Sequence, residues 1–130
     1  MELFRTYLMV MLGGAFGVAA RMWMSSALGE IFGLAFPIGT LAVNVLGSFL
    51  IGAVMHLGVT TDIFSPTQRA MLASGVLGGF TTYSSFSYET VRLLQDGAFA
   101  RGALNLAVTP VVCLGACGLG MAAARAYAGG

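Results

Sequence analysis

The chain has 130 residues, of which 58% are hydrophobic and only 8% are charged, and its formal net charge is +1. Soluble domains carry about a quarter of charged residues, so this chain has too few to cover a surface that faces water. We therefore expect an all-α integral membrane protein, surrounded by membrane lipid, with one membrane domain over residues 1–130. Since a spanning helix needs roughly 20 residues, the length predicts about four transmembrane helices. The nearly neutral charge argues against nucleic acid as a partner.

The first predicted span covers residues 3–28 and contains one internal charge. Gly13 and Gly17 form a GxxxG pair, which predicts that another helix packs closely on this face. Arg21 lies near the far end of the span. Its guanidinium group is expected either to reach the membrane interface or to lie at the mouth of an aqueous vestibule, where it would attract anions.

The second predicted span, residues 37–57, carries a polar stripe. Thr40, Asn44 and Ser48 recur every four residues, a spacing that places them on one face of a helix. Asn44 lies near the middle of the span, where a polar side chain is costly. Its amide is expected either to bond to another helix or to donate hydrogen bonds to an anion that has lost its water.

The third predicted span, residues 68–95, is expected to break near residues 78–82. Glycine loosens a helical backbone and hydroxyl groups offer it competing hydrogen bonds, so the sequence Gly78-Gly79-Phe80-Thr81-Thr82 is a poor continuous helix. Carbonyl groups freed at such a break are typical of ion sites in membrane proteins.

Three side chains after the predicted break share one helical face, namely Tyr83, Phe86 and Glu89. An aromatic pair at this spacing is usually a packing contact. Beside a polar stripe, however, the positive edges of the rings can also face an anion. Glu89 is expected to lie either near the water interface or in a vestibule.

The fourth predicted span, residues 99–127, carries a second, weaker polar stripe that includes Asn105 and Thr109. Glycines follow this stripe and are expected to permit close helix packing; they are Gly115, Gly118 and Gly120.

The arginines predict how two copies of the chain assemble. Four spans place three arginines on each side of the membrane, so the positive-inside rule gives no preferred orientation. The two groups are Arg5, Arg69 and Arg125 on one side and Arg21, Arg92 and Arg101 on the other. We therefore expect a dual-topology antiparallel homodimer, in which each break meets its own copy on an inverted two-fold axis. Carbonyls pooled from the two chains would suit a hard cation such as Na⁺.

Three sequence runs resemble one known family. Residues 13–21 (GGAFGVAAR), 39–49 (GTLAVNVLGSF) and 78–87 (GGFTTYSSFS) are similar to motifs of the CrcB/Fluc fluoride channels, in the same order and over essentially the whole chain. The resemblance implies a fluoride-selective channel that exports fluoride passively across the bacterial inner membrane. It also implies an antiparallel homodimer with two pores and a structural Na⁺ on the two-fold axis, held by the backbone carbonyls of Gly78 and Thr81.

The resemblance also assigns roles to side chains. Asn44 would be the pore asparagine, and the ring edges of Tyr83 and Phe86 would line the fluoride path, with Arg21 in the vestibule. A polar track toward the vestibule would be formed by Thr40, Glu89, Asn105 and Thr109. Ser48, on the same stripe as Asn44, is also expected to line the fluoride pore. Tyr83 departs from the family pattern, because phenylalanine is usual at the first aromatic position.

Other functions are less consistent with these residues. A proton-coupled antiporter of the small multidrug resistance type also has four spans, but its mechanism needs a carboxylate buried early in the chain. The first span has none after Glu2. A non-conducting structural subunit would leave the polar stripes without a role. An enzyme is not expected, because no nucleophile–base pair, metal-ligand cluster or phosphate-binding loop occurs at a usable spacing.

Overall fold

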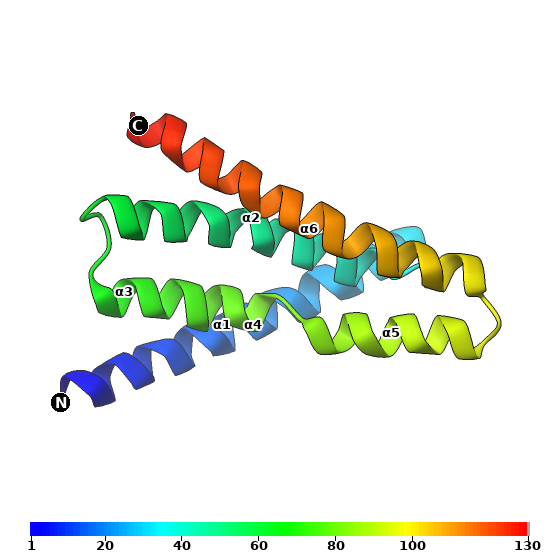
Figure 1. Ribbon diagram of the computed structural model, residues 1–130. Helices are drawn as coiled ribbons and strands as arrows, with labels where there is room; N and C mark the ends of the chain where they lie inside the picture. Colours follow the sequence, from blue (N-terminus) through cyan, green and yellow to red (C-terminus); the bar gives the residue numbers. More distant parts are fainter. Residues whose placement is uncertain (130) are drawn as a thin grey trace.

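The computed structural model describes residues 1–129, which form helices and short loops without any strand. In chain order, the elements are α1 (Glu2–Phe32), α2 (Ile38–Thr60), α3 (Pro66–Ala70), the π-helix η1 (Met71–Leu77), α4 (Gly78–Phe80), α5 (Tyr83–Gln95) and α6 (Phe99–Ala128). The chain runs back and forth along one long axis, as α1, α2, the run of shorter helices from α3 to α5, and α6 (Figure 1). Both termini therefore lie at the same end of an elongated bundle.

Three helices among the described residues, α1, α2 and α6, are long and apolar enough to cross a membrane. They correspond to the first, second and fourth predicted spans, and α1 ends at Phe32, four residues beyond the predicted boundary. The run from α3 to α5 follows the same axis, but it is divided, and its longest helix, α5, has only 13 residues. That length is shorter than the roughly 20 residues of a spanning helix.

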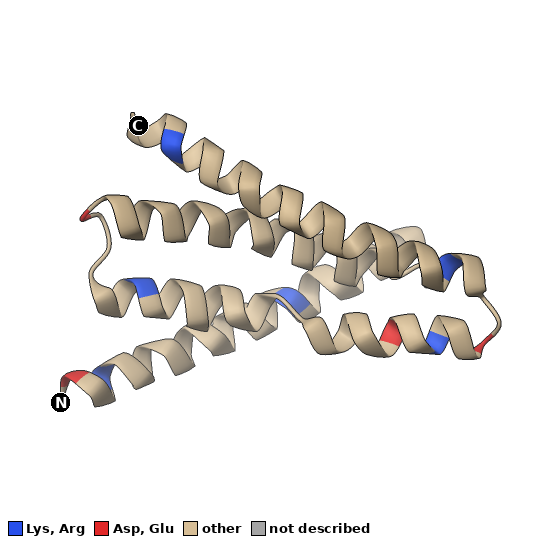
Figure 2. Cartoon of the chain, in the orientation of Figure 1, with Lys and Arg blue, Asp and Glu red and all other residues tan. Residues whose placement is uncertain are grey.

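Large apolar side chains face outward along the bundle. Phe16 and Trp23 on α1 are 68% and 74% exposed, and Leu114 on α6 is 75% exposed. Charged residues, in contrast, gather mostly toward the two ends (Figure 2). A soluble monomer would not expose so much apolar surface, so this surface is suited to lipid or to another apolar protein face.

Glycines bring α1 against η1 and α4, as the GxxxG pair predicts. A Cβ atom added at Gly17 would collide with the carbonyl oxygen of Val76, and one added at Gly13 would lie 2.9 Å from the carbonyl oxygen of Met71. The backbones of these helices are therefore in direct contact. A larger residue at Gly17 would force them apart.

A second glycine contact joins α2 to α6. A Cβ atom at Gly120 would collide with the Phe49 carbonyl, and one at Gly52 would collide with the Cys117 carbonyl. The packing predicted for Gly120 is thus confirmed. The same prediction is wrong within this chain for Gly115 and Gly118, because they lie on another face of α6 and a Cβ atom on either would meet nothing within 4 Å.

The helix break is shorter than predicted and follows an element that the sequence did not predict. Residues 71–77 form a π-helix, a wider helix in which N–H groups bond five residues back, and Gly78 N–H bonds to the carbonyl of Ala73. Gly78 and Gly79 are still helical, and only Thr81 (φ −93°, ψ 157°) and Thr82 (φ −150°, ψ 114°) are extended. The glycine at position 79 serves close packing, since a Cβ atom there would lie 2.6 Å from the Gly14 carbonyl oxygen.

Candidate functional site

The side chain of Asn44 forms hydrogen bonds with the backbone of the break. Its Nδ2 donates to the carbonyl oxygen of Thr82 at 2.9 Å, and the N–H of Thr82 donates to its Oδ1 at 2.8 Å. Asn44 is only 9% exposed. The sequence left two expectations for this amide, a bond to another helix or donation to an anion. The interhelical bonding is present, and it uses the oxygen and one of the two hydrogens of the amide. One N–H remains for another acceptor.

The two threonines of the break end one helix and begin the next. The N–H and the hydroxyl of Thr81 both donate to the carbonyl of Leu77, each at 3.0 Å. Thr82 is the N-cap of α5, because its Oγ1 accepts the N–H of Ser85 at 3.1 Å. The break thus places a helix C-terminus, which carries partial negative charge, beside a helix N-terminus, which carries partial positive charge.

Arg21 of α1 also contacts the backbone next to the break. Its Nε donates to the carbonyl oxygen of Gly79 at 3.0 Å. α1 continues for another 11 residues to Phe32, so Arg21 lies within the helix and not at its end. The two expectations for Arg21, at the membrane interface or at a vestibule, stay predictions. Along the chain the other arginines divide into three near one end of the bundle and two near the other, and Arg21 bonds to the break.

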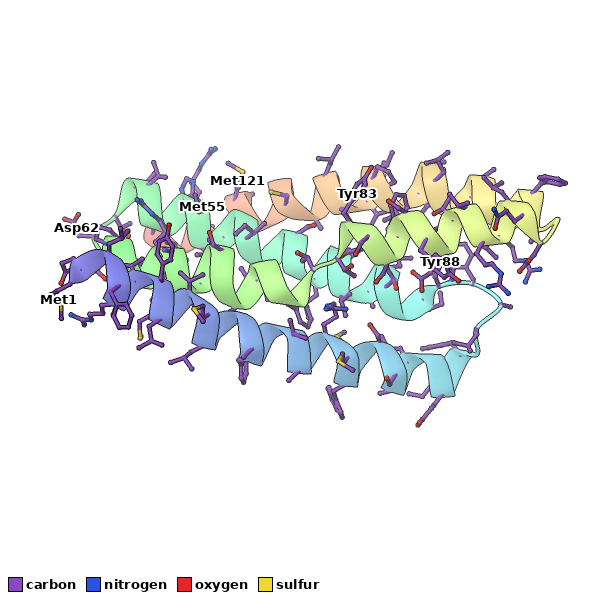
Figure 3. All side chains as sticks on the ribbon, turned by 90° about the horizontal axis from the view of Figure 1, so that it is seen from below. Met1, Met55, Asp62, Tyr83, Tyr88 and Met121 are labelled. Carbon is purple, nitrogen blue, oxygen red and sulfur yellow. The ribbon has the colours of Figure 1, made fainter. Side chains whose placement is uncertain are left out.

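The two aromatic residues after the break contact each other. The ring centroids of Tyr83 and Phe86 are 5.6 Å apart and the rings are inclined by 62°, an edge-to-face arrangement. Phe86 is 6% exposed, whereas Tyr83 is 80% exposed. Figure 3 shows Tyr83 on a different side of α5 from Tyr88. The predicted shared face of Tyr83 and Phe86 is confirmed.

A cavity of about 350 Å³ lies beside the break and opens to the surface of the bundle. It combines side chains of α2, the break, α5 and α6. Among the predicted pore residues, it is lined by Asn44, Ser48, Tyr83, Phe86 and Thr109, together with Thr81 of the predicted cation site. Its polar groups face the pair of aromatic rings, so the cavity offers both hydrogen bonds and ring edges.

Two other predicted residues, Thr40 and Glu89, line a separate cavity of about 440 Å³ at the end of the bundle where α5 ends. One carboxylate oxygen of Glu89 is buried there without a hydrogen-bond partner among residues 1–129. The neighbouring Arg92 donates from Nε to the carboxylate of Asp96 at 3.2 Å. The predicted polar track is thus divided between two cavities in the single chain, and Arg92 is a lining residue that the sequence did not single out.

Asn105 lies between α5 and α6 and is 1% exposed. The hydroxyl of Thr109 donates to its Oδ1 at 2.8 Å, and its Nδ2 donates to the hydroxyl of Thr90 at 2.8 Å. Thr90 in turn donates to the carbonyl of Phe86 at 2.7 Å. The network fixes the helix that carries Phe86. Sequence reasoning missed Thr90, although its position four residues after Phe86 was a usable signal.

The hydrogen bonds around the break leave two carbonyl groups without their helical partners. In a continuous helix the Gly78 carbonyl would accept the N–H of Thr82, which donates instead to Asn44. The Thr81 carbonyl would accept the N–H of Ser85, which donates instead to the side chain of Thr82. Gly78 and Thr81 also line a small cavity of about 170 Å³. Carbonyl oxygens of this kind fit a hard monovalent cation.

Comparison with known proteins identifies relatives of the chain. Residues 8–121 match the model of the family described as CrcB-like protein, Camphor Resistance (CrcB). A protein of Sorangium cellulosum named fluoride-specific ion channel FluC is 54% identical over 88% of this chain and 90% of its own length. Relatives with the same name in a Geobacter species (46% identical, 87% of this chain, 91% of the relative) and an Anaeromyxobacter species (49%, 82% and 85%) are also similar.

These relatives are named as channels and not as enzymes, and the chain has the long apolar helices of a multi-pass membrane protein. The family match covers most of the chain, including the break and all the residues that line the cavity beside it. This chain belongs to the CrcB-like family.

Proposed function

We propose that this chain is a fluoride-selective ion channel through which fluoride leaves the cell passively across the bacterial inner membrane. The observation that carries the proposal is the cavity beside the break, where the amide of Asn44 and the rings of Tyr83 and Phe86 meet. The names of the relatives support fluoride as the ion.

The chemistry of the cavity suits a small anion that is strongly hydrated. Such an ion enters a narrow path only where the protein replaces its lost water with hydrogen-bond donors. The free N–H of Asn44, the hydroxyl of Ser48 and the positive ring edges are such groups. The N-terminus of α5 adds partial positive charge at the same level. Thr109 has a smaller part, because its hydrogen is committed to Asn105 and only its lone pairs face the cavity.

The functional unit that we propose is an antiparallel homodimer with two pores. In the single chain the cavity is open and Tyr83 is 80% exposed, so a second copy is needed to enclose the path. The run from α3 to α5 would then be the third of four membrane crossings, since it follows the same axis as the three long helices (Figure 1). Thr40, Glu89 and Asn105 would continue or support the path, and Arg21 would draw anions toward it.

A structural Na⁺ at the dimer axis completes the proposal. The carbonyls of Gly78 and Thr81 would hold it, supported by their unused lone pairs and by the negative end of the α3–α4 segment. Two carbonyls from each chain would together supply about four oxygen ligands, and oxygen is the ligand atom that hard cations prefer. Because carbonyls of both chains would bind the ion, it would stabilise the contact between the two breaks.

The test is fluoride efflux from liposomes that contain the purified protein, measured with a fluoride electrode and compared with chloride efflux. We expect rapid release of fluoride and no comparable release of chloride. Equal release of both halides would contradict selectivity. A dimer that releases neither ion, and that stays silent when Tyr83 is replaced by phenylalanine, would contradict the channel function.

A further inference from the structure

We propose that Asn44 is a positioning residue for the cation site, in addition to its part in the ion path. By holding the N–H of Thr82, its side chain keeps the carbonyl of Gly78 from being used inside the helix. The inference rests on the proposed function, because it concerns the proposed Na⁺ site.

The geometry of the amide supports this role. The two hydrogen bonds to Thr82 run in opposite directions, from Nδ2 to the carbonyl at 2.9 Å and from the N–H to Oδ1 at 2.8 Å. Together they fix the orientation of the amide as well as its position. The backbone of Thr82 is extended, and its partner Asn44 lies 38 residues earlier in the chain. A side chain of α2 therefore supplies the hydrogen bonds that the third helical run does not form at this point.

The N–H of Thr82 has one alternative partner nearby in sequence. If the amide of Asn44 were missing, the part-buried N–H would lose its partner, which is unfavourable for a backbone donor away from bulk water. The backbone would relieve this cost by continuing the helix through Thr81, and the N–H would then bond to the Gly78 carbonyl. The Gly78 carbonyl, one of the two proposed ligands of each chain, would then be used inside the helix. The Thr81 carbonyl would change direction as well, because Thr81 would become helical.

The same amide also lines the cavity of Tyr83 and Phe86. The ion path and the cation site therefore share one side chain. The free N–H of Asn44 serves the ion path as a donor, whereas its Oδ1 serves the cation site by accepting the N–H of Thr82. Different substitutions of Asn44 will therefore separate the two roles.

The experiment measures the thermal unfolding of the purified dimer in detergent against Na⁺ concentration, with K⁺ holding the ionic strength constant. An ion that binds only the folded protein raises the unfolding temperature. Replacing Asn44 with serine removes both bonds to Thr82, and we expect about 10–100-fold more Na⁺ to be needed for the same stabilisation. Asn44→Asp keeps an acceptor for the Thr82 N–H, so the Na⁺ response should stay close to that of the native protein. Fluoride efflux should nevertheless fall, because the free N–H is lost.

Asn105→Ser is the matched control, because Asn105 is also a buried asparagine with two side-chain bonds but does not contact the break. We expect a lower unfolding temperature with an unchanged dependence on Na⁺. The inference is overturned if folded Asn44→Ser responds to Na⁺ like the native protein, or if folded Asn44→Asp loses the response. Should the serine variant not fold, the aspartate variant alone decides.

Failure of the inference is distinguishable from failure of the proposed function. A native protein that conducts fluoride but is not stabilised by Na⁺ overturns the inference and leaves the channel function intact. A native protein that is stabilised by Na⁺ but does not conduct fluoride contradicts the channel function, while the variants still test the role of Asn44.

Discussion

The ring of Tyr83 stands at the open side of the cavity, 80% exposed and in edge-to-face contact with Phe86. Its hydroxyl is not needed for that contact. We therefore expect Tyr83→Phe to keep fluoride efflux at or above the native rate, because the ring edge is retained. Tyr83→Ile removes the ring and should abolish most of the fluoride flux, measured as efflux from liposomes. Efflux through the isoleucine variant at the native rate would show that the ring edge has no part in the path.

The network around Asn105 makes a prediction about stability. Thr109→Val leaves the buried Oδ1 of Asn105 without its donor. We expect a destabilisation of about 1–3 kcal/mol, measured as a lower midpoint of thermal unfolding. Thr60→Val is the control, since Thr60 is exposed and bonds only to the carbonyl of His56 on its own helix. If the two variants unfolded at the same temperature, the network would not contribute to stability.

Periodicity alone predicted which residues share a face, but not which groups they bond. The four-residue spacing correctly placed Asn44 and Ser48 on one cavity, and the spacing of three placed Tyr83 against Phe86. It did not show that the amide of Asn44 bonds to Thr82, or that Arg21 reaches the Gly79 carbonyl. Both bonds join segments more than 30 residues apart, and their geometry depends on how the helices pack.

At the level of helices, the close contacts of α1 and of α6 predict that replacing a glycine there with alanine destabilises the bundle. Gly17→Ala and Gly120→Ala place a methyl group against a backbone carbonyl of the neighbouring helix. Neither backbone can move without separating two helices, so we expect a destabilisation of about 1–3 kcal/mol, as for other overpacked sites. Thermal unfolding of the purified protein measures it.

Gly118→Ala is the matched control on α6, because a Cβ atom there meets nothing within 4 Å. An exposed alanine stabilises a helix by about 1 kcal/mol relative to glycine. An unchanged or higher unfolding temperature would therefore agree with the structure. A marked loss of stability at Gly118 would instead show that another chain covers this face.

The long helices were predictable because their apolar runs are long and uninterrupted, and the ends of α2 and α6 differ from the predicted spans by three residues or fewer. The π-helix at residues 71–77 could not be predicted, because its mostly apolar sequence, MLASGVL, has no feature that distinguishes it from an α-helix. The glycines at 78 and 79 suggested a break that begins three residues too early. The small size of Gly79 serves packing on α1, while the extended backbone begins at Thr81.

The molecule as a whole has nearly balanced charge along its axis. Arg5, Arg69 and Arg125 lie toward the end that holds both termini, whereas Arg92 and Arg101 flank the turn at the other end (Figure 2). Arg21 is bonded to the break between them and adds to neither end. Three arginines against two is a small bias, because orientation depends on the difference in Lys and Arg between the two sides. Such a chain is expected to insert in both directions, as an antiparallel dimer requires.

Two oppositely biased variants test this arrangement. Asp62→Lys adds a positive charge to the turn beside Arg69 and shifts the count from three against two to four against two. Gln95→Lys combined with Arg5→Gln and Arg125→Gln reverses the bias, to one against three. Each protein expressed alone would insert mainly one way and lack antiparallel partners, so cells without another fluoride exporter should become sensitive to fluoride. Expressing both together supplies opposite orientations and should restore resistance. Full resistance from either variant alone, with a C-terminal reporter found on one side only, would show that the channel does not need two orientations.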